Sequence, residues 1–207
     1  MDNREVILDI KNITKTFPGV KALTDVSFQV KKGSVHALVG ENGAGKSTLI
    51  KILTGVYKAD GGHFLFKGEE AHITKPLEAQ KLGLSVVHQE IKLSETLTVA
   101  ENIFLGRPFM TKAHLVDWKK LRVEAKKLLE SLNVDLDVNR EVFRLSIAQK
   151  QIVEICKAMS FDSDLIIMDE PSATLTDKEL DCLFNIIDIL KEKGVFPQCI
   201  IAANQLQ

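Results

Sequence analysis

Apolar and polar positions along the chain follow two different periods, and their alternation predicts the fold class. Short, almost wholly apolar runs at Val35–Val39, Leu84–Val87 and Leu165–Met168 are typical of strands that a parallel sheet buries on both faces. Stretches with helical spacing of apolar residues lie between these runs. This order predicts an α/β fold, in which helices flank a mostly parallel sheet.

The N-terminal part of the pattern predicts a second set of strands. Val6–Ile13 and Val26–Val30 are expected to be strands, with a turn at Phe17–Gly19 between them. His63–Phe66, which is followed by Lys67 and a glycine, indicates a hairpin. Together these segments predict an antiparallel β arm beside the parallel sheet.

Glycines and capping residues set the bounds of the predicted helices near the sheet. Gly55 marks the end of a helix that begins near residue 46, and Gly83 closes a short helix over Pro76–Leu82. A later capping box at Thr176 begins a helix that is expected to reach about Lys193.

From about 94 to 160 the strands stop, and the pattern predicts an inserted helical subdomain. Thr98, Asp117 and Ser146 have side chains that cap helix N-termini, and the first of these helices is expected to run through Leu105. The second helix has an apolar stripe that we expect to lie in the core, made of Trp118, Leu121, Ala125, Leu128, Leu129 and Leu132.

Composition narrows the class of protein. The 207 residues are 45% hydrophobic, which is enough for the core of a single domain over 1–207. A net charge of −1, with scattered basic residues, argues against a nucleic-acid partner. Cys156, Cys182 and Cys199 are odd in number and widely spaced, which is typical of reduced thiols in the cytoplasm. There is no apolar leader and no run of the ~18 apolar residues that a membrane span needs, so a soluble protein is expected.

One stretch between an apolar strand and a helix concentrates the candidate chemistry. It matches the pattern G-x-x-x-x-G-K-[S/T] with the residues Gly40, Glu41, Asn42, Gly43, Ala44, Gly45, Lys46, Ser47 and Thr48. Its glycines allow conformations closed to other residues, so that successive backbone N–H groups point at a phosphate chain. The helix beginning at Lys46 adds the positive end of its dipole. Lys46 would reach the β- and γ-phosphates, and the Ser47 hydroxyl would bind Mg²⁺.

Polar residues that follow strands or begin helices are further candidates. His88–Glu90 ends a strand and is either a ligand contact or a solvated loop. Asp169 is placed to hold Mg²⁺ and Glu170 to orient and deprotonate an attacking water, the alternative being an acidic surface turn. Ser146, with Gln149 at capping-box spacing, is either a plain N-cap or a hydrogen-bond donor to an anion.

The order of these motifs resembles that of ATP-binding-cassette (ABC) ATPases. The glycine loop, Gln89, the segment Leu145–Gln149 and the pair Asp169-Glu170 follow one another as in that family, across about Arg4–Gly194. The resemblance is to the first cassette of the tandem ATPases that energise monosaccharide importers of the ribose, galactose and arabinose type. Three stretches narrow the resemblance to this group of sugar importers: Phe17–Leu23, Val87–Glu90 and Leu97–Gly106.

The resemblance implies roles by position. Phe17 would stack on adenine, and Gln89 would touch Mg²⁺ and the attacking water. Asp169 would support Mg²⁺, and Glu170 would polarise the water. The residues Ser146, Ala148 and Gln149 would close over the γ-phosphate of an ATP held by a second cassette.

The resemblance also implies partners. A groove formed in part by the segment 94–107 would receive a cytoplasmic helix of transmembrane permease subunits, and a sugar-binding protein would act indirectly through them. ATP with Mg²⁺ would drive closure of the two cassettes. The protein would be cytoplasmic and peripheral, on the inner face of the cell membrane.

Three departures from the family's pattern are visible. In the segment Leu145–Gln149, isoleucine and alanine replace the two glycines of the family's usual L-S-G-G-Q. In the loop after Glu170, threonine (Thr176) stands where the family usually has an aspartate. An ungapped alignment places the family's switch histidine at Ala202, after a strand containing Pro197, and a proline fits poorly in a central strand. We therefore expect an atypical tail over 195–207, as in a truncated or frame-shifted product, and strongly impaired turnover.

Three functional hypotheses follow. The first is an ATPase cassette of a sugar importer, and the second is a cassette that binds ATP but hydrolyses little of it. The third is an ABC protein outside transport, which would usually carry long coiled-coil insertions or basic segments that this sequence lacks.

Overall fold

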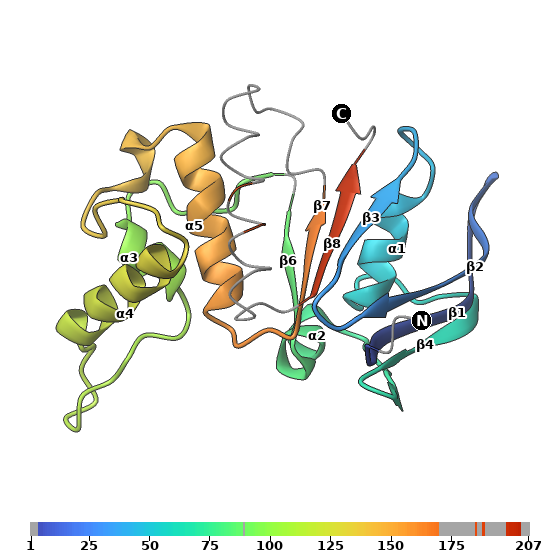
Figure 1. Ribbon diagram of the computed structural model, residues 1–207, viewed down its shortest axis with the longest axis horizontal. Coiled ribbons are helices and arrows are strands. Elements are labelled where there is room, and N and C mark those ends of the chain that lie inside the picture. The colour runs from blue at the N-terminus through green and yellow to red at the C-terminus, as the bar shows by residue number, and fades with distance from the viewer. Residues whose placement is uncertain (1–3, 89, 170–184, 186–187, 189–197, 204–207) are drawn as a thin grey trace.

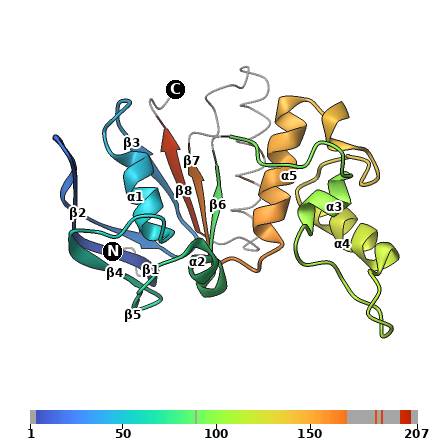
Figure 2. The same ribbon diagram turned by 180° about the vertical axis from the view of Figure 1, so that it is seen from behind.

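The computed structural model describes residues 4–88, 90–169, 185, 188 and 198–203, the last of these for the backbone only. An antiparallel sheet, a parallel sheet and a group of helices follow one another across the molecule (Figure 1). Figure 2, from the opposite side, shows α1 between the two sheets and the helical group beyond the parallel sheet. This arrangement confirms the α/β class and the β arm.

The arm is built from long paired strands. β1 (Val6–Phe17) pairs with β2 (Val20–Lys31) and with β4 (Gly61–Phe66), which pairs in turn with the short β5 (Glu69–Glu70), in the order β2-β1-β4-β5. Strand β2 begins six residues earlier than the predicted Val26. Cross-strand pairing with β1 extends it over residues 20–25, whose mixed apolar and polar pattern alone carries no strand signal.

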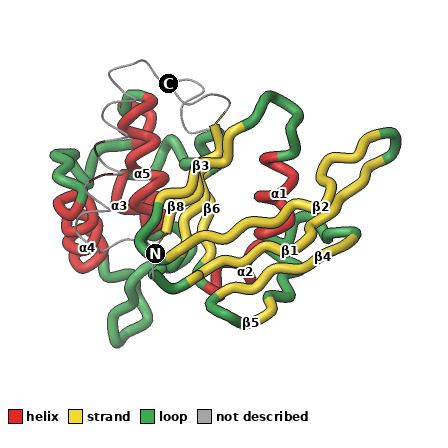
Figure 3. Tube along the Cα trace, turned by 45° about the vertical axis from the view of Figure 1, so that its right-hand side comes forward, coloured by secondary structure: helices red, strands yellow, loops and turns green. Residues whose placement is uncertain are grey.

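The parallel sheet has the order β3-β8-β7-β6 (Figure 1). Figure 3 shows the strands of the arm beside it, in yellow. The parallel strands are β3 (Val35–Val39), β8 (Gln198–Ala203), β7 (Leu165–Asp169) and β6 (Leu84–Val87). β8 lies between β3 and β7, so part of the stretch predicted to be atypical forms a central strand. Pro197, which was predicted to lie in this strand, is outside the described residues, so its place stays a prediction.

The two helices near the sheet end where the glycines predict. Helix α1 (Lys46–Leu53) is followed by Gly55, whose backbone is left-handed and where a Cβ would meet Ile73 Cγ2 at 2.7 Å. Helix α2 (Pro76–Leu82) ends at Gly83, which is also left-handed. The helix predicted after Thr176 lies outside the described residues.

The helical group contains α3 (Val99–Ile103), α4 (Trp118–Ser131), the 3₁₀ turn Val142–Arg144 (η1) and α5 (Ile147–Met159). Two details of the prediction are wrong. Helix α3 ends two residues before Leu105, and Trp118 is 48% exposed rather than in the core. Trp118 is the first residue of α4 and lies at the end of its apolar stripe.

Strand β7 joins two hydrophobic cores. Ile166 and Met168 pack with the helical group, whereas Leu165 and Ile167 pack with α1 and the arm. Because successive strand side chains point to opposite faces, this short strand supports both sides of the molecule. Its C-terminal end carries Asp169.

Candidate phosphate-binding site

The loop between β3 and α1 surrounds a cavity of about 380 Å³. The backbone of Gly43 has φ 86° and that of Gly45 has φ 91°, a region that other residues rarely adopt. Gly40 is not left-handed, so our conformational reason for it is wrong; a Cβ there would lie 3.1 Å from Ala44 Cβ, and its role is close packing. The residues that line the cavity are Ala22, Asn42, Gly43, Gly45, Lys46, Ser47 and Thr48.

The loop lies directly against strand β2. A Cβ on Gly45 would stand 2.3 Å from the carbonyl oxygen of Ala22 and 2.8 Å from Leu23 Cδ2. Gly45 is also the N-cap residue of α1, so the first N–H groups of that helix open beside the arm. One wall of the cavity is therefore formed by β2, which brings Ala22 to the site.

Lys46 is held within the loop that precedes it. Its Nζ donates to the carbonyl oxygen of Gly40 at 2.6 Å and to that of Glu41 at 3.0 Å, and the residue is only 7% exposed. A buried ammonium must be paired with polar groups, and the loop carbonyls supply them. The positive charge is thus fixed at the cavity before any anion arrives.

Ser47 and Asp169 meet although 122 residues separate them in sequence. The Ser47 hydroxyl, in the first turn of α1, donates to Asp169 Oδ1 at 3.3 Å, from the end of β7. Hydroxyl and carboxylate oxygens are hard ligands of the kind that Mg²⁺ takes. The donor set therefore fits a divalent cation beside the phosphate loop, although the described residues hold no cluster of three His, Cys, Asp or Glu side chains.

The pKa of His88, just beyond β6, is lowered. Burial of the ring is the main cause, and the nearby positive charge of Lys92 adds to it, while Asp169 acts in the opposite direction. The imidazole is accordingly neutral at pH 7 and adds no positive charge at this edge of the sheet. Two predicted site residues near this edge, Gln89 and Glu170, lie outside the described residues.

Phe17, at the end of β1, is half-buried and makes an edge-to-face contact with Tyr57, at 5.3 Å between ring centroids. The Nζ of Lys15 lies 5.5 Å from the Phe17 centroid. The ring is not among the residues that line the cavity. Its stacking on adenine stays a prediction.

The segment Leu145–Gln149 begins α5 at the same edge of the molecule as the glycine loop, but on the helical side of the parallel sheet (Figure 1). Ser146 caps α5: its Oγ accepts from the Gln149 N–H at 3.2 Å, and Gln149 Oε1 accepts from the Ser146 N–H at 3.1 Å. Among the residues described, no hydrogen bond or ion pair joins this segment to the glycine loop. The capping role is confirmed, and the side chain of Ser146 is exposed at the surface.

Sequence reasoning missed Ala22, which lines the cavity. Ala22 lines the cavity because of where β2 passes the loop. A single alanine in a strand gives no sequence pattern that would mark it as part of a cavity wall.

A glycine loop between a parallel strand and a helix, with Ser47 beside Asp169, defines the P-loop class of α/β proteins. The sequence profile described as ABC transporter matches residues 23–173. Since this match covers more than half of the chain, the protein belongs to the ABC transporter family. Among the described residues, no helix combines the length and the apolar character that crossing a membrane requires.

Curated relatives and a solved structure agree with the family. The chain is 53% identical over 190 residues to a putative ribose/galactose/methyl galactoside import ATP-binding protein of Halalkalibacterium halodurans, covering 91% of this chain and 36% of that protein. It is 50% identical over 192 residues to a protein of the same description, number 1, of Agrobacterium fabrum, covering 93% and 38%. The chain thus spans less than two-fifths of the length of these relatives.

The fold matches a solved ATP-binding cassette of an ABC transporter in its ADP conformation. The two are 32% identical with a TM-score of 0.86, and the match covers 98% of this chain and 83% of the other.

Proposed function

We propose that this chain binds ATP with Mg²⁺ at the glycine loop and, paired with a second cassette, hydrolyses it to energise a sugar importer. The hydrogen bond between Ser47 and Asp169 beside the loop cavity carries the proposal. Two segments far apart in sequence bring oxygen ligands to one point there, next to a fixed lysine ammonium. A chance glycine-rich turn has no reason to assemble this set.

The chain's own groups divide the work. The N–H groups of Gly43–Ser47 would donate to the phosphate oxygens at the start of α1, and Lys46 would shift from the loop carbonyls to the β- and γ-phosphates. Ser47 and Asp169 would hold Mg²⁺, which neutralises phosphate charge when bound. Glu170 and Gln89 are proposed to orient the attacking water, and Phe17 to contact adenine.

Membership of the ABC transporter family and the relatives' descriptions support an import role, for which we propose a second cassette and a permease as partners. Both relatives are described as import ATP-binding proteins for ribose, galactose or methyl galactoside. We infer a ribose-like monosaccharide as cargo, permease subunits as the transmembrane partners and a sugar-binding protein as an indirect one. A location on the inner face of the membrane, held by the permease, belongs to the same proposal.

A second candidate is a cassette that binds ATP but hydrolyses little of it. Strand β8 places Ala202 in register with Asp169 on one side and with Leu38 on the other, at the end of the sheet that carries the site. The family's switch histidine would be expected at this position. The methyl side chain of alanine cannot donate a hydrogen bond to a phosphate or to water as an imidazole can, so this register favours slow turnover.

Calorimetric titration of Mg²⁺-ATP into the chain tests the proposal. Lys46→Ala is expected to weaken ATP binding about 10- to 100-fold, the loss of one or two charge-assisted hydrogen bonds. Lys51→Ala is the matched control, because Lys51 lies on the same helix but contacts the Tyr57 ring rather than the cavity. Equal binding by all three proteins, or by none, contradicts the proposed site.

The same titration separates the two candidates. Continuing heat of turnover that Glu170→Gln abolishes supports the ATPase. A simple binding isotherm without continuing heat, identical in wild type and Glu170→Gln at chain concentrations where sedimentation shows ATP-dependent pairing, supports the binding cassette with low turnover.

A further inference from the structure

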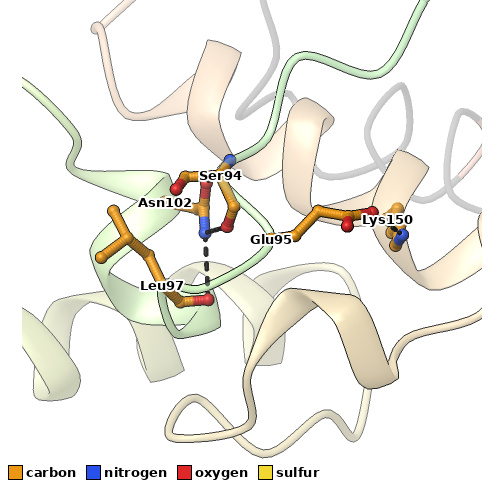
Figure 4. A network of polar contacts seen from close by, with 5 residues as sticks. All are labelled: Ser94, Glu95, Leu97, Asn102 and Lys150. Carbon is orange, nitrogen blue, oxygen red and sulfur yellow. Dashed lines mark hydrogen bonds and ion pairs between the residues drawn. The ribbon is translucent and has the colours of Figure 1, made fainter.

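Buried polar side chains hold the segment Lys92–Thr98, which leads from β6 to α3. The Asn102 side chain belongs to a residue that is 0% exposed, and it pairs both backbone groups of Ser94 (Figure 4). Asn102 Oδ1 accepts from the Ser94 N–H at 2.8 Å, and Nδ2 donates to the Ser94 carbonyl at 2.9 Å. The same Nδ2 lies 3.3 Å from the carbonyl oxygen of Leu97 and 3.0 Å from that of Thr98. Asn102 therefore fixes the shape of the segment.

Helix α5 holds the same segment from the other side. The carboxylate of Glu154, a residue that is 8% exposed, accepts from the Lys92 N–H at 2.9 Å. One turn earlier, the Lys150 Nζ forms an ion pair with Glu95 at 3.0 Å, as Figure 4 shows. Lys150 and Glu154 are four residues apart and therefore lie on the same face of α5, so one face of this helix contacts the segment at two points.

These contacts between α5 and the segment lie next to the exposed N-terminus of α5. The Lys150 N–H donates to the carbonyl oxygen of Ser146 at 2.9 Å, so the residue that pairs with Glu95 also closes the first turn of the helix. A buried carboxylate costs free energy unless it is paired, and here a backbone N–H supplies the pairing. The contact between Glu154 and the Lys92 N–H therefore holds the start of the segment at a fixed position on α5.

We propose that Asn102 and Glu154 are positioning residues: Asn102 fixes the shape of Lys92–Thr98, Glu154 ties this segment to α5, and together they set the place of Ser146. The inference rests on the proposed function in one respect, namely that Ser146 acts on a bound nucleotide. The mechanical part is independent of it: when the lock is broken, the segment and the first turn of α5 loosen together.

Hydrogen exchange of the full chain, followed by mass spectrometry, tests the mechanical part without nucleotide. Glu154→Ala is expected to speed exchange of amides in 92–98 about tenfold, because the Lys92 N–H loses its acceptor. It is expected to speed exchange in 146–150 several-fold and to leave the glycine loop, 40–48, unchanged. Glu154→Gln keeps an acceptor oxygen and is expected to restore near-wild-type exchange in both segments.

Two further variants complete the test. Glu130→Ala is the matched control, since its ion pair with Lys126 lies within α4. Glu95→Gln removes only the surface pair with Lys150 and preserves the buried contacts, so it remains informative even if Glu154→Ala or Asn102→Ala unfolds; faster exchange in 146–150 is expected. Faster exchange in 92–98 with no change in 146–150, in either Glu154→Ala or Glu95→Gln, overturns the proposal.

Adding Mg²⁺-ATP to the same samples separates the two proposals. Failure of ATP to protect 40–48 in the wild type contradicts the proposed function and leaves the nucleotide-free comparison valid. If ATP protects 40–48 and also alters exchange in 146–150, Glu154→Ala is expected to reduce the second effect by at least about half while ATP affinity stays within about twofold. An undiminished effect at 146–150 overturns the positioning role.

Discussion

At the scale of single residues, three glycines of one motif serve different physical needs. Gly43 adopts a left-handed backbone in open space, where a Cβ would have no atom within 4 Å. Gly45 combines a left-handed backbone with close approach to the Ala22 carbonyl, and Gly40 requires only a small side chain against Ala44. The motif therefore records two constraints, backbone conformation and contact, that its letters alone do not distinguish.

Substitution of Gly45 and Gly43 by alanine separates these constraints. Gly43→Ala is expected to lower the free energy of unfolding by about 1–2 kcal/mol, the cost of a left-handed alanine. Gly45→Ala adds a clash with the backbone of β2, so a loss of about 2–4 kcal/mol is expected. Urea unfolding of both variants measures the difference. Equal losses would mean that β2 moves away from the loop at no cost.

At the scale of elements, helix α5 begins with a cap that has two possible uses. The capping box of Ser146 and Gln149 satisfies N–H groups at the start of the helix. An N-cap needs only an acceptor oxygen, whereas the proposed contact with a phosphate needs the hydroxyl as a donor. The two uses of Ser146 can be separated by chemistry at this one position.

Ser146→Ala is expected to lower the free energy of unfolding by about 1 kcal/mol, and Ser146→Asp to restore it, because aspartate caps helices as well as serine does. Neither variant is expected to support ATP-dependent association of two chains, measured by sedimentation in a Glu170→Gln background. Asp117→Ala is the control, since the Asp117 side chain caps α4 by accepting from the Lys120 N–H and lies outside both the site and the segment Lys92–Thr98. Recovery of association in Ser146→Asp would show that Ser146 is a plain cap.

At the scale of the whole molecule, the parallel sheet makes one site out of distant segments. Strand β7 contributes Ile166 and Met168 to the helical core, and Leu165 and Ile167 to the core beneath the arm. Both cores therefore fix the end of β7, where Asp169 reaches Ser47. A ligand held there stabilises the folded chain as a unit, because it binds only when both segments are in place.

Mg²⁺-ATP at about 100 times its dissociation constant is expected to add about 2.7 kcal/mol to the free energy of unfolding. For a chain of this size, this raises the midpoint of thermal unfolding by roughly 5–10 °C. Chelation of Mg²⁺ with EDTA, or the variant Ser47→Ala, is expected to reduce the shift. Ser131→Ala, at the far end of α4, serves as the control. The same shift with and without Mg²⁺ would contradict the assignment of Ser47 and Asp169 to the cation.

Local patterns were sufficient for the elements whose cause is local. The glycine loop, the ends of α1 and α2, and the caps at Thr98, Asp117 and Ser146 are confirmed, because each depends on residues within one turn. The length of β2 and the exposure of Trp118 were predicted wrongly. Both depend on what lies opposite in space, and the pattern along the chain does not contain that neighbour.

The sequence by itself determined the class of this protein. The order of strands and helices, and a loop whose glycines and lysine suit phosphate, are properties of consecutive residues. Tertiary structure decided how the site is assembled: Ala22 forms a wall because β2 passes the loop, and Ser47 meets Asp169 because β7 ends beside α1. It also decided that Glu154 holds the Lys92 amide. Such contacts depend on the packing of whole elements, which no short stretch of sequence specifies.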